Sequence, residues 1–311
     1  MAQTGPRQQI FSRAYVVFPL LVALLVFLAD ADTAYLSRVN YLKSRIDYYL
    51  LSFENGKAPF DRQNFIQSAR YYELLAGRSN LADIFYAHMG FCRYYLGDLD
   101  RAFKAYETAL SLQPHIYTYS WDLGMISYTF GDHSRAVQYL QRSLQEIPWT
   151  MRLMIDLVRK HNIRLGQEGA SRILNRFRIR AQQDEIHAIH ILAQSYDRLG
   201  QHEQMLQAAT LGITRHGANP LLLFDQALAL LRMGRYGVAE QIFSVAIAAD
   251  PLVLGGQGYH YRSLARSHLG ETTAAQEDEA QALRLGMTDP EEQEPYPLHT
   301  NFDLIYLLYQ A

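Results

Sequence analysis

The sequence of 311 residues contains one cysteine and almost no net charge. A single cysteine, Cys92, excludes a disulfide within the chain. We expect Cys92 to be a small core residue rather than a reactive thiol. The formal net charge is −2, from 29 Lys and Arg against 31 Asp and Glu. This balance argues against a general nucleic-acid binder, which would need a strongly basic surface.

The sequence also lacks the motifs of common catalytic sites. Residues 255–258 are rich in glycine but no strand precedes them, so we expect a turn rather than a phosphate-binding loop. No HExxH motif is present, and no Ser, His and Asp arrangement comes with a nucleophile elbow. His187 and His190 lie three residues apart on an expected helix, but no matching carboxylate or cysteine pattern accompanies them. We therefore predict no enzyme activity, metal or cofactor, with a metal-dependent enzyme at this histidine pair as a remote alternative.

The chain does contain a repeat of 34 residues. Five residues recur at this offset: Gly90, Gly97, Asp98, Ala102 and Pro114 return as Gly124, Gly131, Asp132, Ala136 and Pro148. Further copies are marked by Ala170, Ala193, Ala239 and Ala275. A period of this length is typical of stacked helical hairpins.

The repeat resembles the tetratricopeptide family, whose pattern is W-x2-L-G-x2-Y, then A-x3-F, then P. The first copy reads Tyr86-x2-Met89-Gly90, then Ala102-x3-Tyr106, then Pro114. The resemblance covers residues 83–285 and implies an all-α fold, a right-handed α-α superhelix of about six helical hairpins. The sequence departs from the pattern at Ser120 and Leu223, where a large aromatic residue is usual, and at Val158, where a small residue is usual.

The marked positions have physical reasons. Glycine or alanine inside the first helix, as at Gly90 and Gly124, lets the second helix of the hairpin approach closely. Glycine adopts the left-handed conformation that ends a first helix. We expect this at Gly97, Gly131, Gly200, Gly234 and Gly270. Proline at the end of a copy is expected to end the second helix, at Pro114, Pro148 and Pro251.

The N-terminus has a strongly apolar segment. Residues 14–29 are apolar or aromatic apart from Pro19, with Arg7 and Arg13 before them and Asp30 just after. We predict a cytoplasmic tail over 1–13 and an uncleaved transmembrane anchor over 14–31. The alternative is a signal peptide, because residues 29–31 resemble a cleavage site and a 16-residue helix spans only about 24 Å. Either way the repeats face away from the cytoplasm, on a bacterial inner membrane or free in the periplasm.

The segments before and after the repeats are expected to cover the two ends of the repeat array. Residues 32–80 suggest a degenerate first hairpin, with helices over 33–52 and from Asp61 to about Ala76. Residues 286–311 suggest an acidic loop and a short apolar helix from Thr300 to Gln310. This last helix either caps the final repeat or inserts into a groove or a partner.

The resemblance also implies where a partner binds, because the first helix of each hairpin forms the concave face in this family. The candidate contacts are Phe91, Tyr94, Tyr95, Trp121, Met125 and Tyr128. Farther along, the same face is expected to carry His190, Gln194, Asp197, Phe224, Leu228 and Leu231. Aromatic and Met side chains on such a face favour an apolar or amphipathic segment of a protein partner. The alternative is that the aromatic side chains pack between hairpins.

A basic stretch offers a second contact. Between Arg152 and Arg180 there are eight Lys or Arg residues against Asp156 and Glu168. Such a run forms either a solvated helix face or a docking site for an acidic partner, with Arg159, Arg172 and Arg176 as its candidates. Together these features predict a membrane-tethered scaffold that binds a protein segment and supports assembly or stability of a membrane or envelope complex. The alternative is a soluble periplasmic adaptor in pilus, envelope-polymer or cytochrome assembly. Neither reading includes a nucleic acid or a small-molecule substrate.

Overall fold

The computed structural model describes residues 45–50, 52–53, 57–76, 82–251, 256–286 and 298–299, without the side chains of 161–165. The chain divides into two units, Met1–Phe60 and Asp61–Ala311. In the first unit, residues 45–50 and 52–53 are helical, and the Tyr49 hydroxyl donates to the Pro59 carbonyl at 3.1 Å. The expected anchor over 14–31 and the expected helix from Thr300 lie outside the described residues. Among the helices that are described, none combines the length and the apolar character needed to cross a membrane.

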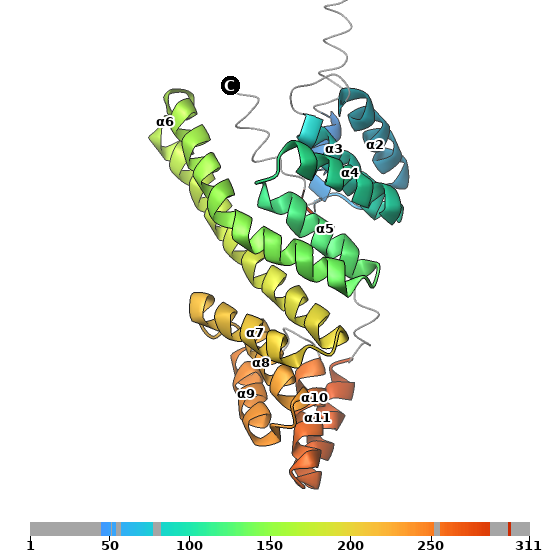
Figure 1. The fold of residues 1–311 in the computed structure, drawn as a ribbon, viewed down its shortest axis with the longest axis vertical. Helices are drawn as coiled ribbons and strands as arrows, with labels where there is room; N and C mark the ends of the chain where they lie inside the picture. Colours follow the sequence, from blue (N-terminus) through green and yellow to red (C-terminus); the bar gives the residue numbers. More distant parts are fainter. Residues whose placement is uncertain are drawn as a thin grey trace, which may run out of the picture. The chain divides into compact units, whose positions relative to one another are not determined.

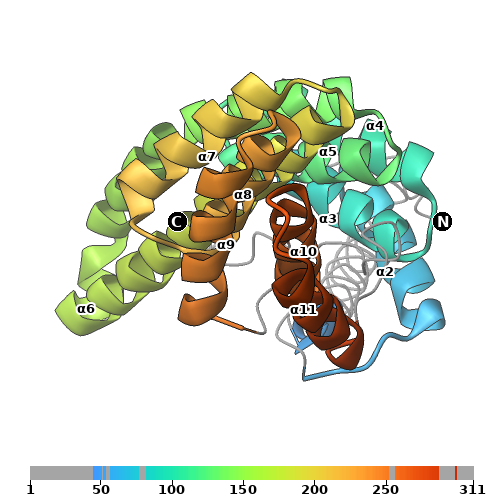
Figure 2. The ribbon, with the colours of Figure 1, turned by 90° about the horizontal axis from the view of Figure 1, so that it is seen from below.

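The second unit is built from α-helices, and its described residues contain no strand. Each helix packs mainly against its neighbours in the sequence, so that paired helices follow one another along the chain (Figures 1 and 2). The helices are α2 (Arg62–Ala76), α3 (Ala82–Tyr95), α4 (Leu99–Leu112), α5 (Tyr117–Thr129), α6 (His133–Arg198), α7 (His202–His216), α8 (Pro220–Arg232), α9 (Tyr236–Ala249), α10 (Gln257–His268) and α11 (Thr272–Arg284). This order confirms the expected all-α helical repeat.

The glycine turns lie where the sequence predicts them. All five glycines expected to end a first helix have positive φ, between 69° and 81°. At the first of these turns, the amide of Gly97 donates to the Tyr94 carbonyl and that of Asp98 to the Arg93 carbonyl, both at 2.9 Å. These bonds satisfy carbonyls that the end of α3 leaves without helical partners. The chain can therefore reverse directly into α4.

Close approach of the paired helix explains the small residues inside the first helices. A Cβ atom on Gly90 would lie 2.6 Å from the Tyr106 ring of the paired helix, and one on Gly124 would lie 2.6 Å from Leu140. Both distances are far below ordinary carbon contacts, so only glycine fits at this approach. Cys92 on the same helix is fully buried, and burial raises the pKa of its thiol. It is a core residue, as expected.

The prediction that Pro148 ends a helix is wrong. Helix α6 runs through Pro148, and its helical geometry is interrupted instead at Gly166, with φ 67° and ψ 161°. Thr150 holds the helix at this point, because its hydroxyl accepts from the Tyr117 amide at 3.0 Å and donates to the His115 carbonyl at 2.8 Å. Figure 1 shows α6 as two long arms that meet at a turn. The weak repeat copy around Ala170 therefore has no separate helices. Its first helix continues from the second helix of the copy before it, and its second helix continues into the first helix of the copy after it.

Candidate functional site

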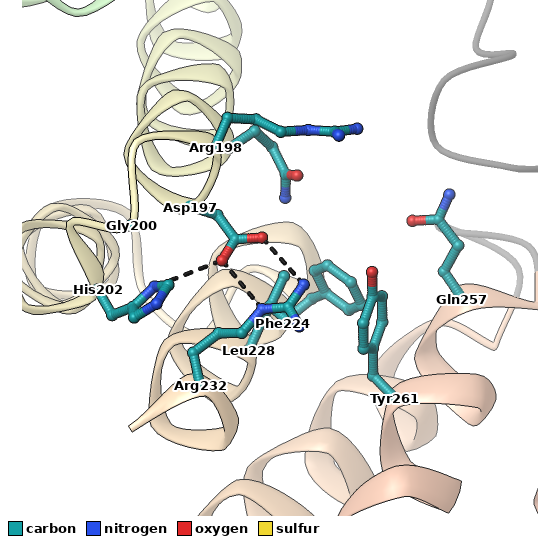
Figure 3. Close-up of a pocket in the computed structure, with 10 residues that line it drawn as sticks. Asp197, Arg198, Gly200, His202, Phe224, Leu228, Arg232, Gln257 and Tyr261 are labelled. Atoms are coloured by element: carbon teal, nitrogen blue, oxygen red, sulfur yellow. Dashed lines mark hydrogen bonds and ion pairs between the residues drawn. The ribbon is translucent and has the colours of Figure 1, made fainter. Parts of the chain in front are cut away.

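A pocket of about 620 Å³ lies where the second arm of α6 meets α8 and α10 (Figure 3). These three helices are first helices of successive hairpins, and the start of α7 completes the rim. The lining residues are Gln194, Asp197, Arg198, Gly200, His202, Phe224, Leu228, Arg232, Gln257 and Tyr261. The pocket therefore combines side chains from three repeats.

The base of this pocket is apolar. Phe224 and Leu228 lie one helical turn apart on α8 and are almost completely buried. The Tyr261 ring packs edge-on against Phe224, with ring centroids 5.6 Å apart. Phe243 of α9 supports Phe224 from behind at 5.7 Å. These ring contacts hold Phe224 at the base of the pocket.

An ion pair crosses the pocket. Arg232 donates from Nε to Asp197 Oδ1 at 3.0 Å and from Nη2 to Asp197 Oδ2 at 3.2 Å. Hydrogen bonding to Asp197 raises the pKa of Arg232, and its guanidinium lies 5.8 Å from the centre of the Tyr261 ring. His202 Nδ1 is 3.4 Å from Asp197 Oδ1, which is an ion-pair distance without hydrogen-bond geometry. The two-point pair joins α6 to α8 and holds one arginine at the pocket wall.

The rim adds a second arginine and two amides. Arg198 is exposed, while Gln257 is buried at the start of α10. The Gln194 amide nitrogen donates to Asp225 Oδ1 at 3.1 Å. Two arginines against one aspartate give the lining a formal charge of +1, with the histidine neutral. This lining suits a polar segment that carries a carboxylate and offers backbone groups to the amides.

The two histidines predicted as a remote metal site do not act together. His190 is buried, and its Nδ1 lies 2.8 Å from Oδ2 of the buried Asp225. Burial raises the pKa of Asp225, although His190 opposes this effect. His187 is exposed on the same helix. Within the described part of the chain, no group of three or more His, Cys, Asp or Glu residues is placed to hold a metal ion.

The aromatic residues predicted as partner contacts are largely enclosed. Phe91, Tyr94, Trp121 and Met125 are buried, whereas Tyr95 and Tyr128 are half-buried. Phe91 stacks on Phe65 of α2 at 6.2 Å. In this structure these side chains take part in packing between helices.

The basic candidates lie on α6 and do not line the pocket. Arg159 and Arg172 are exposed and lie 3.7 Å from Asp156 and 3.2 Å from Glu168, respectively. Arg176 is exposed as well. They are exposed on the two arms of α6, before and after Gly166, and so remain accessible as a second contact.

The sequence predicted four of the ten residues that line the pocket. Gln194, Asp197, Phe224 and Leu228 were expected on the inner face, and the structure brings them together. Gly200 was expected only as a helix-ending turn, and the sequence did not predict Arg198, His202, Arg232, Gln257 and Tyr261 on this face. The last two could have been found by extending the inner-face rule to the first helix of the last hairpin, whereas the arginines lie at helix ends outside that rule.

Comparison with known proteins supports the repeat. Residues 93–148 match the tetratricopeptide repeat family. This match spans α4, α5 and the start of α6, where the sequence echo is strongest. It supports the fold of a protein-interaction scaffold, and the matching family is not an enzyme family. None of the curated proteins compared with this chain matches it.

Similar solved structures include a tetratricopeptide protein, YrrB, described as having an unusual peptide-binding site. It is 14% identical, with 70% of this chain and 93% of that chain covered and a TM-score of 0.49. Two structures of MamA are 17% and 16% identical, with TM-scores of 0.47 and 0.48. They cover 63% and 69% of this chain and 94% and 97% of their own.

Proposed function

We propose that this chain is a non-catalytic scaffold that holds an extended segment of a protein partner in the pocket between α6, α8 and α10. One observation carries the proposal: three successive first helices line a single pocket of about 620 Å³ with an apolar base and a hydrogen-bonding rim. Such a combination buries one side chain and orients the rest of a segment.

The chemistry of the lining narrows the partner segment. An apolar or aromatic side chain fits against Tyr261, whose ring is half-buried beside the almost fully buried Phe224. The formal charge of +1 on the lining attracts an Asp or Glu side chain of the partner. We therefore propose an acidic, amphipathic segment as the ligand.

A displayed peptide library tests this proposal directly. Selection on the wild-type chain is expected to enrich peptides that pair an Asp or Glu with an apolar residue. An Arg198→Glu variant should bind the selected peptides with a dissociation constant roughly tenfold larger or more. A tenfold change corresponds to about 1.4 kcal/mol of binding free energy, which we expect one reversed charge near the peptide carboxylate to cost. Arg235→Glu is the matched control, because Arg235 is an exposed arginine at the start of α9 and does not line the pocket. Equal loss in both variants, or no enrichment of acidic residues, would refute the proposal.

We further propose that the apolar segment over 14–31 tethers the scaffold to a membrane and that the complex it serves is a membrane or envelope assembly. The tether raises the local concentration of the repeats near membrane partners. The mass of the mature chain tests this. An intact N-terminus in the membrane fraction supports the tether, whereas loss of about 31 residues would favour the soluble periplasmic adaptor.

The exposed arginines of α6 are proposed as a second contact for an acidic partner surface. Reversing Arg172 and Arg176 together should weaken partner capture without changing helicity. Unchanged capture would limit the binding surface to the pocket.

A further inference from the structure

Residues 298 and 299 lie buried among helices that are far from them in the sequence. Leu298 is 1% exposed and His299 is 3% exposed. The His299 ring lies between two carboxylates: its Nδ1 is 2.9 Å from Asp122 Oδ1 on α5, and its Nε2 is 2.9 Å from Asp184 Oδ2 on α6. The side chain is therefore clamped at both ring nitrogens by helices of two different hairpins.

The two carboxylates favour a positively charged side chain between them. Ionised carboxylates only accept hydrogen bonds, so two of them on one ring match the doubly protonated imidazolium. Asp122 is completely buried and Asp184 nearly so. Burial raises the pKa of Asp122, and the charge and hydrogen bonds of His299 oppose that rise. A neutral side chain at this place would leave buried carboxylate charge uncompensated.

The walls around the clamp are preorganised. The Tyr117 hydroxyl donates to Asp184 Oδ2 at 2.6 Å, and the Trp121 indole donates to the Asp184 carbonyl at 3.2 Å. The Trp121 ring meets the His299 ring edge-on, with centroids 4.4 Å apart. Trp121, which the sequence predicts as a partner contact, therefore contacts a residue of its own chain.

The backbone of the segment is bound as well. The His299 amide donates to Asp122 Oδ1 at 3.0 Å, and the Tyr106 hydroxyl donates to the His299 carbonyl at 3.5 Å. In peptide recognition, main-chain hydrogen bonds contribute affinity and side-chain pockets contribute specificity. Residues 298–299 are placed in the manner of a ligand.

We propose that Asp122, Asp184 and Trp121 form a peptide-binding subsite for an apolar residue followed by a cationic one, and that Leu298 and His299 are its intramolecular occupant. A partner segment with the same pair takes this place only by displacing the chain's own residues. This subsite does not depend on the proposed function, because it shares no residue with the pocket lined by α6, α8 and α10.

The test uses the full chain with a specific protease site introduced between residues 287 and 297. After cleavage, the released C-terminal piece is expected to stay bound and to co-elute with the repeats on gel filtration. Asp184→Asn should weaken its retention at least tenfold. Glu185→Gln is the matched control, because Glu185 is the neighbouring carboxylate and pairs with Arg215 rather than with His299. Retention by Asp184→Asn equal to wild type, or immediate loss of the piece from wild type, overturns the proposal.

A second measurement avoids any change to the helices. His299→Ala in the uncleaved chain should expose the subsite to a labelled synthetic peptide of residues 294–303. We expect this peptide to bind the variant at least tenfold more tightly than wild type, and the same peptide with alanine at its histidine position not to bind. Equal binding to both chains, or to neither, contradicts the subsite.

The two proposals fail separately. If Arg198→Glu binds acidic peptides normally while Asp184→Asn loses the C-terminal piece, only the proposed pocket function is wrong. If Arg198→Glu loses acidic peptides while Asp184→Asn retains the C-terminal piece, only the subsite is wrong.

Discussion

Gly90 shows how one missing methyl group fixes a helix pair. A Cβ atom at this position would clash with the fully buried ring of Tyr106, so the core around the ring would have to shift. Gly90→Ala is therefore expected to reduce the free energy of unfolding by about 1–3 kcal/mol, measured by chemical denaturation.

Gly237 provides the matched control for this substitution. It is the second residue of α9, where an added Cβ atom meets nothing within 4 Å. Gly237→Ala should raise the free energy of unfolding by about 0.4–1 kcal/mol, since alanine has less backbone freedom to lose when the chain folds. An alanine at position 90 that stabilised the chain as well would contradict the close approach of α3 and α4.

His299 makes the C-terminal contact dependent on pH. Burial lowers the pKa of this imidazole, but Asp184 and Asp122 outweigh burial and raise it from 6.5 to about 9. A raised pKa means that the contact is fully formed below about pH 6.5 and weakens as the pH rises through 9. The titratable groups that face or influence the ring are Tyr106, Tyr117, Asp122, Arg180, Asp184 and His187.

The dissociation constant of the cleaved C-terminal piece measures this effect. It should be at least tenfold larger at pH 9.5 than at pH 6. A constant value across this range would show that the imidazolium is not the bound form.

At the residue scale, the sequence allowed some predictions and not others. The small residues and the glycine turns could be predicted, because their reasons are local and recur at a fixed spacing. The His299 contact could not, because 177 residues separate His299 from Asp122. A lone Leu-His pair after an acidic stretch carries no periodic signal.

At the scale of elements, α6 is where local rules fail. Pro114 and Pro148 occupy the same place in their repeats, yet α4 ends before the first and α6 continues through the second. A proline inside a helix lacks an amide donor and crowds the preceding turn. The Thr150 bonds to the His115 carbonyl and the Tyr117 amide hold the helix in place despite this cost.

Pro148→Ala is expected to stabilise the chain. Alanine restores a helical hydrogen bond and removes the crowding, so the free energy of unfolding should rise by about 1–3 kcal/mol. Pro114→Ala, outside any helix, should change it by much less. A drop in stability or helicity for Pro148→Ala would show that α6 needs the proline where it is. Thermal or urea denaturation followed by circular dichroism distinguishes these results.

At the scale of the whole molecule, function depends on side chains that successive repeats bring together. The pocket takes Asp197 from α6, Arg232 from α8 and Tyr261 from α10. The repeat pattern predicts which helices share a face, and it placed Asp197 on that face but neither Arg232 nor Tyr261. It does not predict the two-point ion pair or the size of the cavity, since both depend on how the helices pack in three dimensions.

Site-specific photocrosslinking in cells that express the full chain tests the central claim, that a partner segment occupies this pocket. A photoreactive phenylalanine analogue at position 261 replaces a ring in the pocket wall, and the same analogue at position 245 replaces Val245, which is 53% exposed on α9. We predict a discrete protein adduct from position 261 that disappears with Arg198→Glu, and none from position 245. No adduct at position 261, or equal adducts at both positions, would contradict the account.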